Sequence, residues 1–542
     1  MSMQEVRNLP AEWLAAFERD RLGVTVSNDP LPERRASRVL AAFILSGLLF
    51  LAFPGTLIGV FNLLSIAEQR TSTAANVAWI QAHGQAQVFG WVGAFILGIS
   101  LYFLPKFLGR TIARFGWAWL VWGLWTAGTA WRWWIGVSGG RWRVGLVSSA
   151  AMELAAFAVS QYLLWFAGKR PRQATPAAGA QRGFVFWLVL TGFVAFGMTL
   201  VVNLVISVQV ARAAALPVYP PVGDRMLLTL ALWGFAVPVA WGYSSRFVSV
   251  FLGLREPVRR LAPYLGAGVA ATIVLVLAGE FRLAGFLALA LSIGAIWALR
   301  IFQPPARTVK RIGVYRHYDA FVRLSFAWLL IGAILGALAD ALPQRSGLGG
   351  ASRHAVTVGF LATLIFSIGP RILPSFLNGR ELWSPRLMAA TLWLVSLGCL
   401  LRVSSESLAY SSTGAAWGAA WSVLPASAFL ELGAVLIFVA NIGMTLAQKI
   451  PAWFSPAGVN ANNLVYFYVA SFPKSKSVLV QAGLKTLGGV REVPRSLTLQ
   501  EAAEADGANV EKLLAALREF FADRQPRRAG REPSDESRRE PK

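Results

Sequence analysis

Apolar runs of eighteen or more residues, separated by short basic stretches, fill the sequence from about Val39 to Leu446. Each run is long enough to cross the roughly 30 Å hydrocarbon core of a bilayer as an α-helix. The alternation of apolar and polar residues that a membrane barrel requires is not found in these runs. Because only 14% of the residues are charged and 56% are apolar, a soluble protein is excluded. We predict an all-α, polytopic membrane bundle.

The runs predict about twelve transmembrane helices within a membrane domain of residues 39–447. Residues 1–38 form an N-terminal segment, residues 450–522 a small helical C-terminal domain, and residues 523–542 a disordered tail rich in Arg, Glu, Ser and Pro. The predicted spans are 39–63, 80–104, 115–136, 145–167, 184–206, 226–245, 262–279, 283–302, 320–341, 354–374, 387–403 and 420–446.

Two helices are predicted in the C-terminal domain. Ser496 has the character of an N-cap and is followed by helix-forming residues. The stretch from Val510 to Phe521 repeats apolar residues at helical spacing.

The loops differ in their content of Lys and Arg. One alternate set carries twice as many of these residues as the other, which predicts that this set and both termini lie in the cytoplasm. The formal net charge is +24, but it is spread over many short loops, so no nucleic-acid partner is expected. We therefore predict a multi-pass protein of a bacterial inner membrane, with the lipid bilayer as its surroundings and an oligomeric state that the sequence does not give.

Three spans end alike, which suggests an internal repeat. Gly90, Gly234 and Gly359 each lie seventeen residues before a Phe-Leu pair. The fourth and twelfth spans share a second pattern, Ser-Ala followed by Glu-Leu, at Glu153 and Glu431. Chance matching of apolar helices is one interpretation. The other is that the bundle consists of three quasi-equivalent four-helix units.

Two of the three histidines, His83 and His354, open the second and tenth predicted spans at a similar depth. Two imidazoles placed in this way could bind one haem iron from opposite faces. They could equally be interfacial histidines with ordinary hydrogen bonds. The third, His317, lies in the most basic loop and is interpreted as a structural or headgroup-binding residue.

Other polar residues in the spans have more than one interpretation. Glu153 and Glu431 could be protonated and hydrogen-bonded between helices, or could form part of a proton path or cation site. Arg371 is expected to extend towards the interface. With Cys399 as its single cysteine, the chain cannot form an internal disulfide or a Cys-based metal site.

Two segments resemble the NnrS family of twelve-helix bacterial membrane proteins, which bind haem and copper and are tied to nitric oxide metabolism. One is His354-Ala-Val-Thr-Val-Gly359 with Arg371 and Asn378-Gly379-Arg380, and the other is His83-Gly-Gln-Ala-Gln-Val-Phe-Gly90. The resemblance covers residues 40–447 and implies a haem, of b-type, with His83 and His354 as its ligands. A more distant similarity to the catalytic subunit of haem–copper oxidases implies the same ligand helices.

The sequence departs from the family pattern at the position of a second histidine, where Gln85 stands, and at a glutamate, where Ala86 stands. Too few imidazole or soft ligands remain for a copper site, and the histidines of an oxidase or nitric oxide reductase centre are missing. Residues of about 474–522 are similar to a small hybrid-cluster-associated domain (DUF1858-like) without its cysteines.

The sequence is consistent with three hypotheses of function. The leading one is a haem protein of NnrS type, acting in electron transfer or sensing with a redox partner or nitric oxide. The second is a cofactor-free transporter or channel that uses Glu153 and Glu431. The third is an assembly factor whose C-terminal domain recruits a partner.

Overall fold

The structure, a computed structural model, divides into two units, Met1–Pro30 with Ile450–Lys542 and Leu31–Lys449, and each has its own hydrophobic core. The described residues are 9–14, 16, 30–107, 110–112, 115–165, 168–169, 178–309, 311, 313–342, 347–377, 382–410, 418–448, 458–472, 474–490, 493–494 and 496–522.

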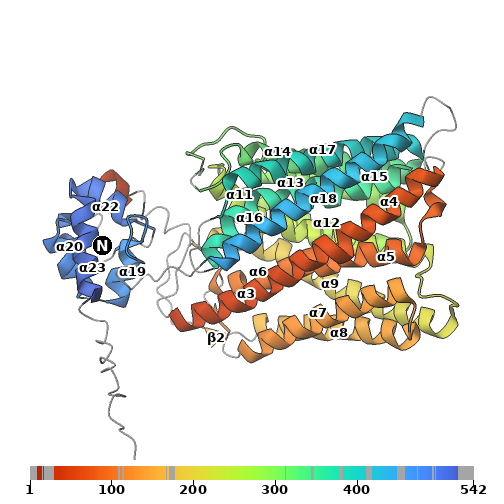
Figure 1. The fold of residues 1–542 in the computed structure, drawn as a ribbon, viewed down its shortest axis with the longest axis horizontal. Coiled ribbons are helices and arrows are strands. Elements are labelled where there is room, and N and C mark those ends of the chain that lie inside the picture. Colours follow the sequence, from red (N-terminus) through yellow and green to blue (C-terminus); the bar gives the residue numbers. More distant parts are fainter. Residues whose placement is uncertain are drawn as a thin grey trace, which may run out of the picture. The chain divides into compact units, whose positions relative to one another are not determined.

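The larger unit is a bundle of twelve long helical rods within the described residues, as the sequence predicts (Figure 1). The rods are, in chain order, α3 (Pro30–Phe50), η1 (Leu51–Leu57) and α4 (Ile58–Gln69); α5 (Val77–Gln85), η3 (Ala86–Gly93) and α6 (Ala94–Phe107); α7 (Phe115–Ser138); α8 (Trp142–Trp165); α9 (Ala178–Ala213); α10 (Pro221–Thr229), η4 (Leu230–Ala236) and α11 (Val237–Phe251); α12 (Ala262–Leu277); α13 (Phe281–Leu299); α14 (Tyr318–Ala341); α15 (Gly347–His354), η6 (Ala355–Ala362) and α16 (Thr363–Phe376); α17 (Pro385–Ala409); and α18 (Gly418–Ala447).

Eleven of these rods are long and apolar enough to cross a membrane. The remaining rod, α7, has 24 residues and is therefore long enough. It is rich in Trp and Gly in place of aliphatic residues, and this lowers its mean hydropathy. The twelve rods confirm the predicted polytopic all-α bundle.

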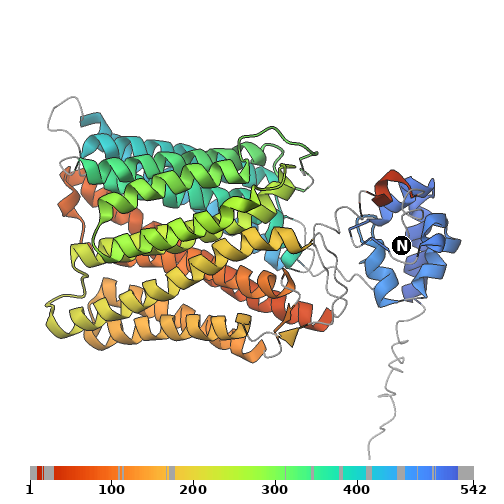
Figure 2. The same ribbon diagram turned by 180° about the vertical axis from the view of Figure 1, so that it is seen from behind.

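The bundle has two ends, which we call the near end and the far end. The near end is where α3 begins and α18 ends, and it carries a short antiparallel pair of strands, β1 (Arg110–Thr111) and β2 (Gly168–Lys169). The far end is where α4 ends and where α5 and α15 begin (Figure 1). Helices from the middle of the sequence, coloured yellow and green, form the opposite face of the bundle (Figure 2).

The predicted repeat has a counterpart in the backbone. Gly90, Gly234 and Gly359 are each the fifth residue of a π-helical segment, η3, η4 and η6 respectively. π-Helical turns are rare and occur mostly as single turns within α-helices, so three at the same register are not expected by chance.

Each of these glycines also packs on the preceding rod. A Cβ atom on Gly90 would lie 2.7 Å from Phe50, one on Gly234 would lie 3.2 Å from Ala195, and one on Gly359 would lie 2.6 Å from Trp328. The second, sixth and tenth rods therefore contact the first, fifth and ninth in the same way, as three four-helix units require.

Among its described residues beyond Ile450, the smaller unit contains five short helices: α19 (Val465–Ser471), α20 (Ser475–Gln481), α21 (Lys485–Gly489), α22 (Leu499–Asp506) and α23 (Val510–Ala522). The predicted amphipathic helix from Val510 is present. The prediction of Ser496 as an N-cap is wrong, because the cap of α22 is Thr498, which forms a capping box with Glu501. The Ser496 hydroxyl instead donates a hydrogen bond to the carbonyl oxygen of Ala16.

The N-terminal segment contributes to the core of this smaller unit. Trp13 and Ala16 are fully buried in the same cluster as Leu479 and Leu513. The predicted disordered tail, residues 523–542, lies outside the described residues.

Candidate functional site

His83 lies near the end of α5 and faces the first rod. Its Nδ1 is 2.8 Å from the carbonyl oxygen of Gly55 in η1. That segment is π-helical and contains Pro54. A Cβ atom on Gly59 would lie 2.7 Å from Cε1 of His83. The first rod therefore accepts the imidazole only because residue 59 has no side chain.

His354 is the last residue of α15. Its Nδ1 is 3.0 Å from the carbonyl oxygen of Gly350 and also 3.0 Å from Oε2 of Glu406 on α17. The same carboxylate oxygen lies 3.4 Å from Nε of Arg402. Only 6% of the Glu406 side chain is exposed, so His354 lies beside a buried ion pair. The helix starts earlier than predicted, at Gly347, so His354 lies about two turns inside the rod and does not open it.

Both histidines line one cavity of about 310 Å³. Its walls come from the first, second, sixth, tenth, eleventh and twelfth rods, so segments from opposite ends of the sequence meet there. This volume falls within the range of about 300 to 1,000 Å³ typical of small-molecule and cofactor sites.

The cavity is polar towards the far end and apolar towards the middle of the bundle. Arg353, Arg402, Glu406 and Tyr410 lie within about two turns of the far-end limits of α15 and α17. Deeper in the bundle the walls are apolar and aromatic, with Trp91, Leu361, Phe366, Val395 and Val435. An amphipathic planar ligand with anionic groups on one edge matches this distribution.

The histidine hydrogen bonds set which nitrogen can bind a metal. A ligating histidine usually donates its second ring N–H to a carbonyl or a carboxylate, which fixes the tautomer and the orientation of the ring. Nδ1 of both His83 and His354 lies at such an oxygen. Nε2 is therefore the nitrogen that each ring has available for a ligand.

The other predicted residues fall at three different places. Glu431 lines the histidine cavity. Gln85 and Glu153 hydrogen-bond to each other on the opposite face of α5, where the amide of Gln85 donates to Oε1 of Glu153 over 2.8 Å. The two glutamates that the sequence pairs by pattern therefore belong to separate polar sites.

The remaining predicted residues lie away from the cavity. Arg371 lies in α16, near the opposite end of its rod, with its guanidinium over the ring of Phe251. His317 precedes α14 and is exposed, and its Nε2 accepts a hydrogen bond from Nε of Arg316. Cys399 is buried in α17. Residues 378–380 lie outside the described residues. Within the described chain no three His, Cys, Asp or Glu side chains are grouped as a metal site.

Arg353, Arg402 and Glu406 are cavity residues that no motif in the sequence predicts. A signal for Arg402 exists in the repeat. Arg132 follows Gly128 by four residues in the third rod, and Arg402 follows Gly398 by four residues in the eleventh. A Cβ atom on Gly128 or Gly398 would press on Glu153 or Glu431, respectively. The same three residue types, a glycine, an arginine four residues later and a glutamate on the next rod, therefore recur in the first and third units.

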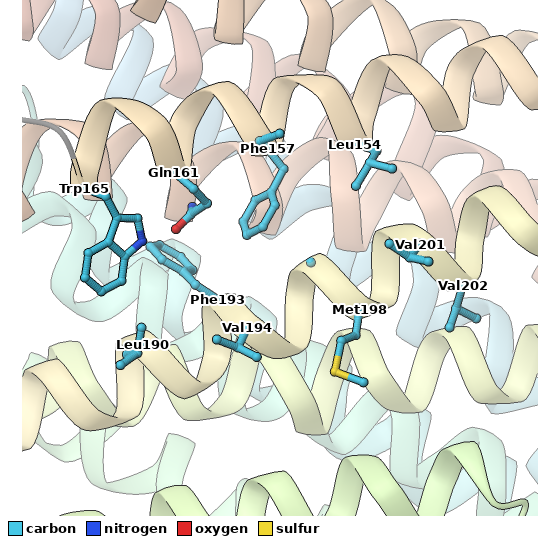
Figure 3. A pocket seen from close by; sticks show the side chains of 12 residues that line it. Leu154, Phe157, Gln161, Trp165, Leu190, Phe193, Val194, Met198, Val201 and Val202 are labelled. Carbon is cyan, nitrogen blue, oxygen red and sulfur yellow. The ribbon is translucent and has the colours of Figure 1, made fainter.

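A larger hollow of about 580 Å³ lies between α8 and α9. Its lining is almost wholly apolar, as Figure 3 shows for Phe157, Phe193 and Met198, and Gln161 is the one polar amide among the labelled residues. Met198 is 38% exposed on the surface of the bundle. The residues that line the hollow carry no charge, and it suits a hydrocarbon chain of the surrounding lipid.

Comparisons with known proteins identify a family and a similar fold. A model of the NnrS protein family matches residues 40–449. A cryo-EM structure of a heme-copper terminal oxidase dimer has a similar fold, with a TM-score of 0.55 and 12% sequence identity, covering 90% of this chain and 99% of that chain. No curated protein sequence matches.

Proposed function

The chain belongs to the NnrS family, and from this premise we propose that it binds one haem in the histidine cavity, where His83 and His354 would hold the iron. The observation that carries the proposal is that both imidazoles line one cavity while Nδ1 of each is held by a helix carbonyl. The similarity in fold to a heme-copper terminal oxidase supports it.

The residues present fit a haem. The deeper aromatic and aliphatic walls suit the macrocycle, and Arg353 and Arg402 at the polar end would pair with its propionates. The one cysteine is on α17 and buried, so the two thioether bonds of c-type attachment cannot form. We therefore propose a non-covalent, b-type haem and no copper.

Two histidine ligands would leave the iron without an open position for a substrate. When bound, the haem would supply one-electron redox chemistry. The protein's part would be to hold both imidazoles in a fixed tautomer and to keep water from the macrocycle. We propose electron transfer or sensing in the response to nitric oxide, in a bacterial inner membrane with both termini in the cytoplasm.

Optical spectra of the purified protein test the haem assignment. Wild type is expected to show a low-spin Soret band that shifts on reduction with dithionite. His83→Ala and His354→Ala should each convert it to a high-spin form or lose it, and the double variant should lack it. His317→Ala is the matched control, because this third histidine is exposed outside the bundle, and its spectrum should be that of wild type. A band that survives in the double variant would falsify the assignment.

A further inference from the structure

Glu153 is the centre of a second polar site inside the bundle, separate from the histidine cavity. Its side chain is fully buried in α8. Oε1 accepts hydrogen bonds from Gln85 over 2.8 Å and from Thr129 over 3.2 Å, and Oε2 accepts one from Asn203 over 3.1 Å. Three different rods therefore direct donors at this carboxylate, which lies near the middle of the bundle.

A chain of hydrogen bonds joins Glu153 to the far end. The hydroxyl of Tyr219, in the connection between α9 and α10, donates to Oδ1 of Asn203 over 2.8 Å and also pairs with the hydroxyl of Ser207 at 2.6 Å. The amide of Gln81 holds the backbone of Tyr219 through two hydrogen bonds, of 2.8 and 3.0 Å. The polar residues thus form a continuous path from the far-end connection to the buried carboxylate.

Aromatic rings close this path towards the near end. Phe89, Trp125 and Phe157 each lie four residues deeper on the same rod than Gln85, Thr129 and Glu153, respectively, so they are on the same helix face, one turn further in. They pack around Phe196, whose ring centroid is 5.3 Å from that of Phe157, 5.7 Å from that of Trp125 and 5.8 Å from that of Phe89. No polar side chain of the path passes this layer.

Arg132, in the third rod, is a buried charged residue close to Tyr219. It is 2% exposed, and its guanidinium lies 4.7 Å from the ring centroid of Tyr219. Nε and Nη1 of Arg132 are buried and have no hydrogen-bond partner among the described residues. Buried guanidinium N–H groups require acceptors, and ordered water supplies them when protein atoms do not. The site is therefore suited to hold water next to the carboxylate.

The repeat shows how this site differs from the histidine cavity. Gln85 and His354 each lie five residues before the repeat glycine of their rod, and Arg132 and Glu153 correspond to Arg402 and Glu431. The first four-helix unit thus keeps the charged frame of the cavity but has an amide where the third unit has an imidazole. The polar site around Glu153 has no imidazole, so its buried carboxylate needs a role other than haem binding.

We infer that Glu153 is a proton-binding site that exchanges with the aqueous phase at the far end only. The carboxylate accepts one proton from water to become the carboxylic acid and returns it by the same route, with no other bond changed. Water beside Arg132 carries the proton between the Tyr219 hydroxyl and the carboxylate, and Asn203, whose amide cannot relay a proton, holds the carboxylate in place. Because the aromatic layer closes the inner side, the site stores a proton and does not conduct one.

Infrared difference spectroscopy after a pH jump tests this inference on the full-length protein in vesicles. Wild type should show the carbonyl band of a protonated carboxylic acid that appears as the pH falls, and Glu153→Gln should lack that band. Glu431→Gln is the matched control, because it removes the corresponding glutamate of the third unit and should retain the Glu153 band. Tyr219→Phe keeps the ring under Arg132 and should retain the band but slow its appearance.

Three outcomes would overturn the inference. The first is that no band sensitive to Glu153→Gln appears at any pH at which the protein stays folded. The second is that Tyr219→Phe exchanges at the wild-type rate. The third is that a jump imposed only on the near-end side is as effective as one on the far-end side. The Soret band of Glu153→Gln reports separately on the histidine cavity, so a failure here is distinct from a failure of the haem assignment.

Discussion

At the scale of single residues, the two histidines differ in the group that holds Nδ1. His83 has the neutral carbonyl of Gly55, whereas His354 has both the carbonyl of Gly350 and the carboxylate of Glu406. The backbone is shaped around that carboxylate, because a Cβ atom on Gly350 would overlap Oε1 of Glu406. A carboxylate at Nδ1 makes an imidazole a stronger electron donor to a metal. Glu406 is therefore the residue that would make the two ligands unequal.

Replacing Glu406 with Gln should raise the midpoint potential of the bound haem, because the loss of the negative charge destabilises the ferric iron more than the ferrous iron. A redox titration followed by absorbance measures this shift. Glu431→Gln is the control in the same cavity, since among the described residues no hydrogen bond or ion pair joins Glu431 to either imidazole, and its shift should be smaller. An unchanged potential in Glu406→Gln, with the Soret band intact, would show that the carboxylate does not act on the ligand.

At the scale of elements, the π-helical segments are what the three units share most closely. η3, η4 and η6 place a glycine at the same register against the preceding rod. A π-helical turn has its backbone hydrogen bonds at a spacing of five residues, and the Thr363 hydroxyl donates to the carbonyl oxygen of Val358 at that spacing. In the first rod, the Thr56 hydroxyl donates to the carbonyl oxygen of Leu51 at the same spacing. Local side chains thus help to stabilise an uncommon backbone at the depth of the histidines.

Gly359→Ala should destabilise the bundle, because its Cβ atom would lie 2.6 Å from Cγ of the Trp328 indole, which has no room to shift within the packed core. Overpacking of this kind costs about 1 to 3 kcal/mol. Thermal unfolding of the purified protein in detergent measures the loss. Gly349→Ala, about three turns away in the same rod, meets no atom within 4 Å and should be neutral or slightly stabilising. Equal melting temperatures for the two variants would contradict this role of Gly359.

At the scale of the whole molecule, the distribution of charge predicts the orientation in the membrane. The near-end loops carry the excess of Lys and Arg, so the near end should face the cytoplasm and the histidine cavity should open towards the outer side. In this orientation the polar mouth of the cavity and the Tyr219 path both face outwards. The haem and the proton-binding site would then communicate with the same aqueous phase.

Labelling of engineered cysteines in intact cells tests the orientation. The native Cys399 is buried and should give little background. Gly140→Cys, at an exposed far-end connection, should react with a membrane-impermeant maleimide, and Arg255→Cys, at an exposed near-end connection, should react only after the cells are opened. The reverse pattern would invert the topology and place the cavity on the cytoplasmic side.

The class of the protein, the number of rods and the repeat can all be predicted from the sequence. Length and apolarity are local properties of the chain. The apolar run that begins at Val39 and the one that ends at Leu446 must each cross a bilayer whatever they pack against. The repeat glycines and the pair Glu153 and Glu431 can be recognised in the sequence for a similar reason. Where corresponding rods share a register, the same residues recur in the sequence at the same spacing. The sequence also predicts His83 and His354 as candidate ligands, because they lie near the ends of two corresponding spans.

Which of these residues lie together depends on how the rods pack. The cavity joins rods from both ends of the chain, so no local pattern shows that Glu406 lies at His354 or that Gly59 makes room for His83. The Ser-Ala and Glu-Leu pattern relates the two glutamates to each other. The packing of the units nevertheless places Glu431 in the cavity and encloses Glu153 in a separate hydrogen-bonded site. Side-chain contacts between distant rods depend on how helices rotate and pack, and that information lies in the whole bundle and not in any one span.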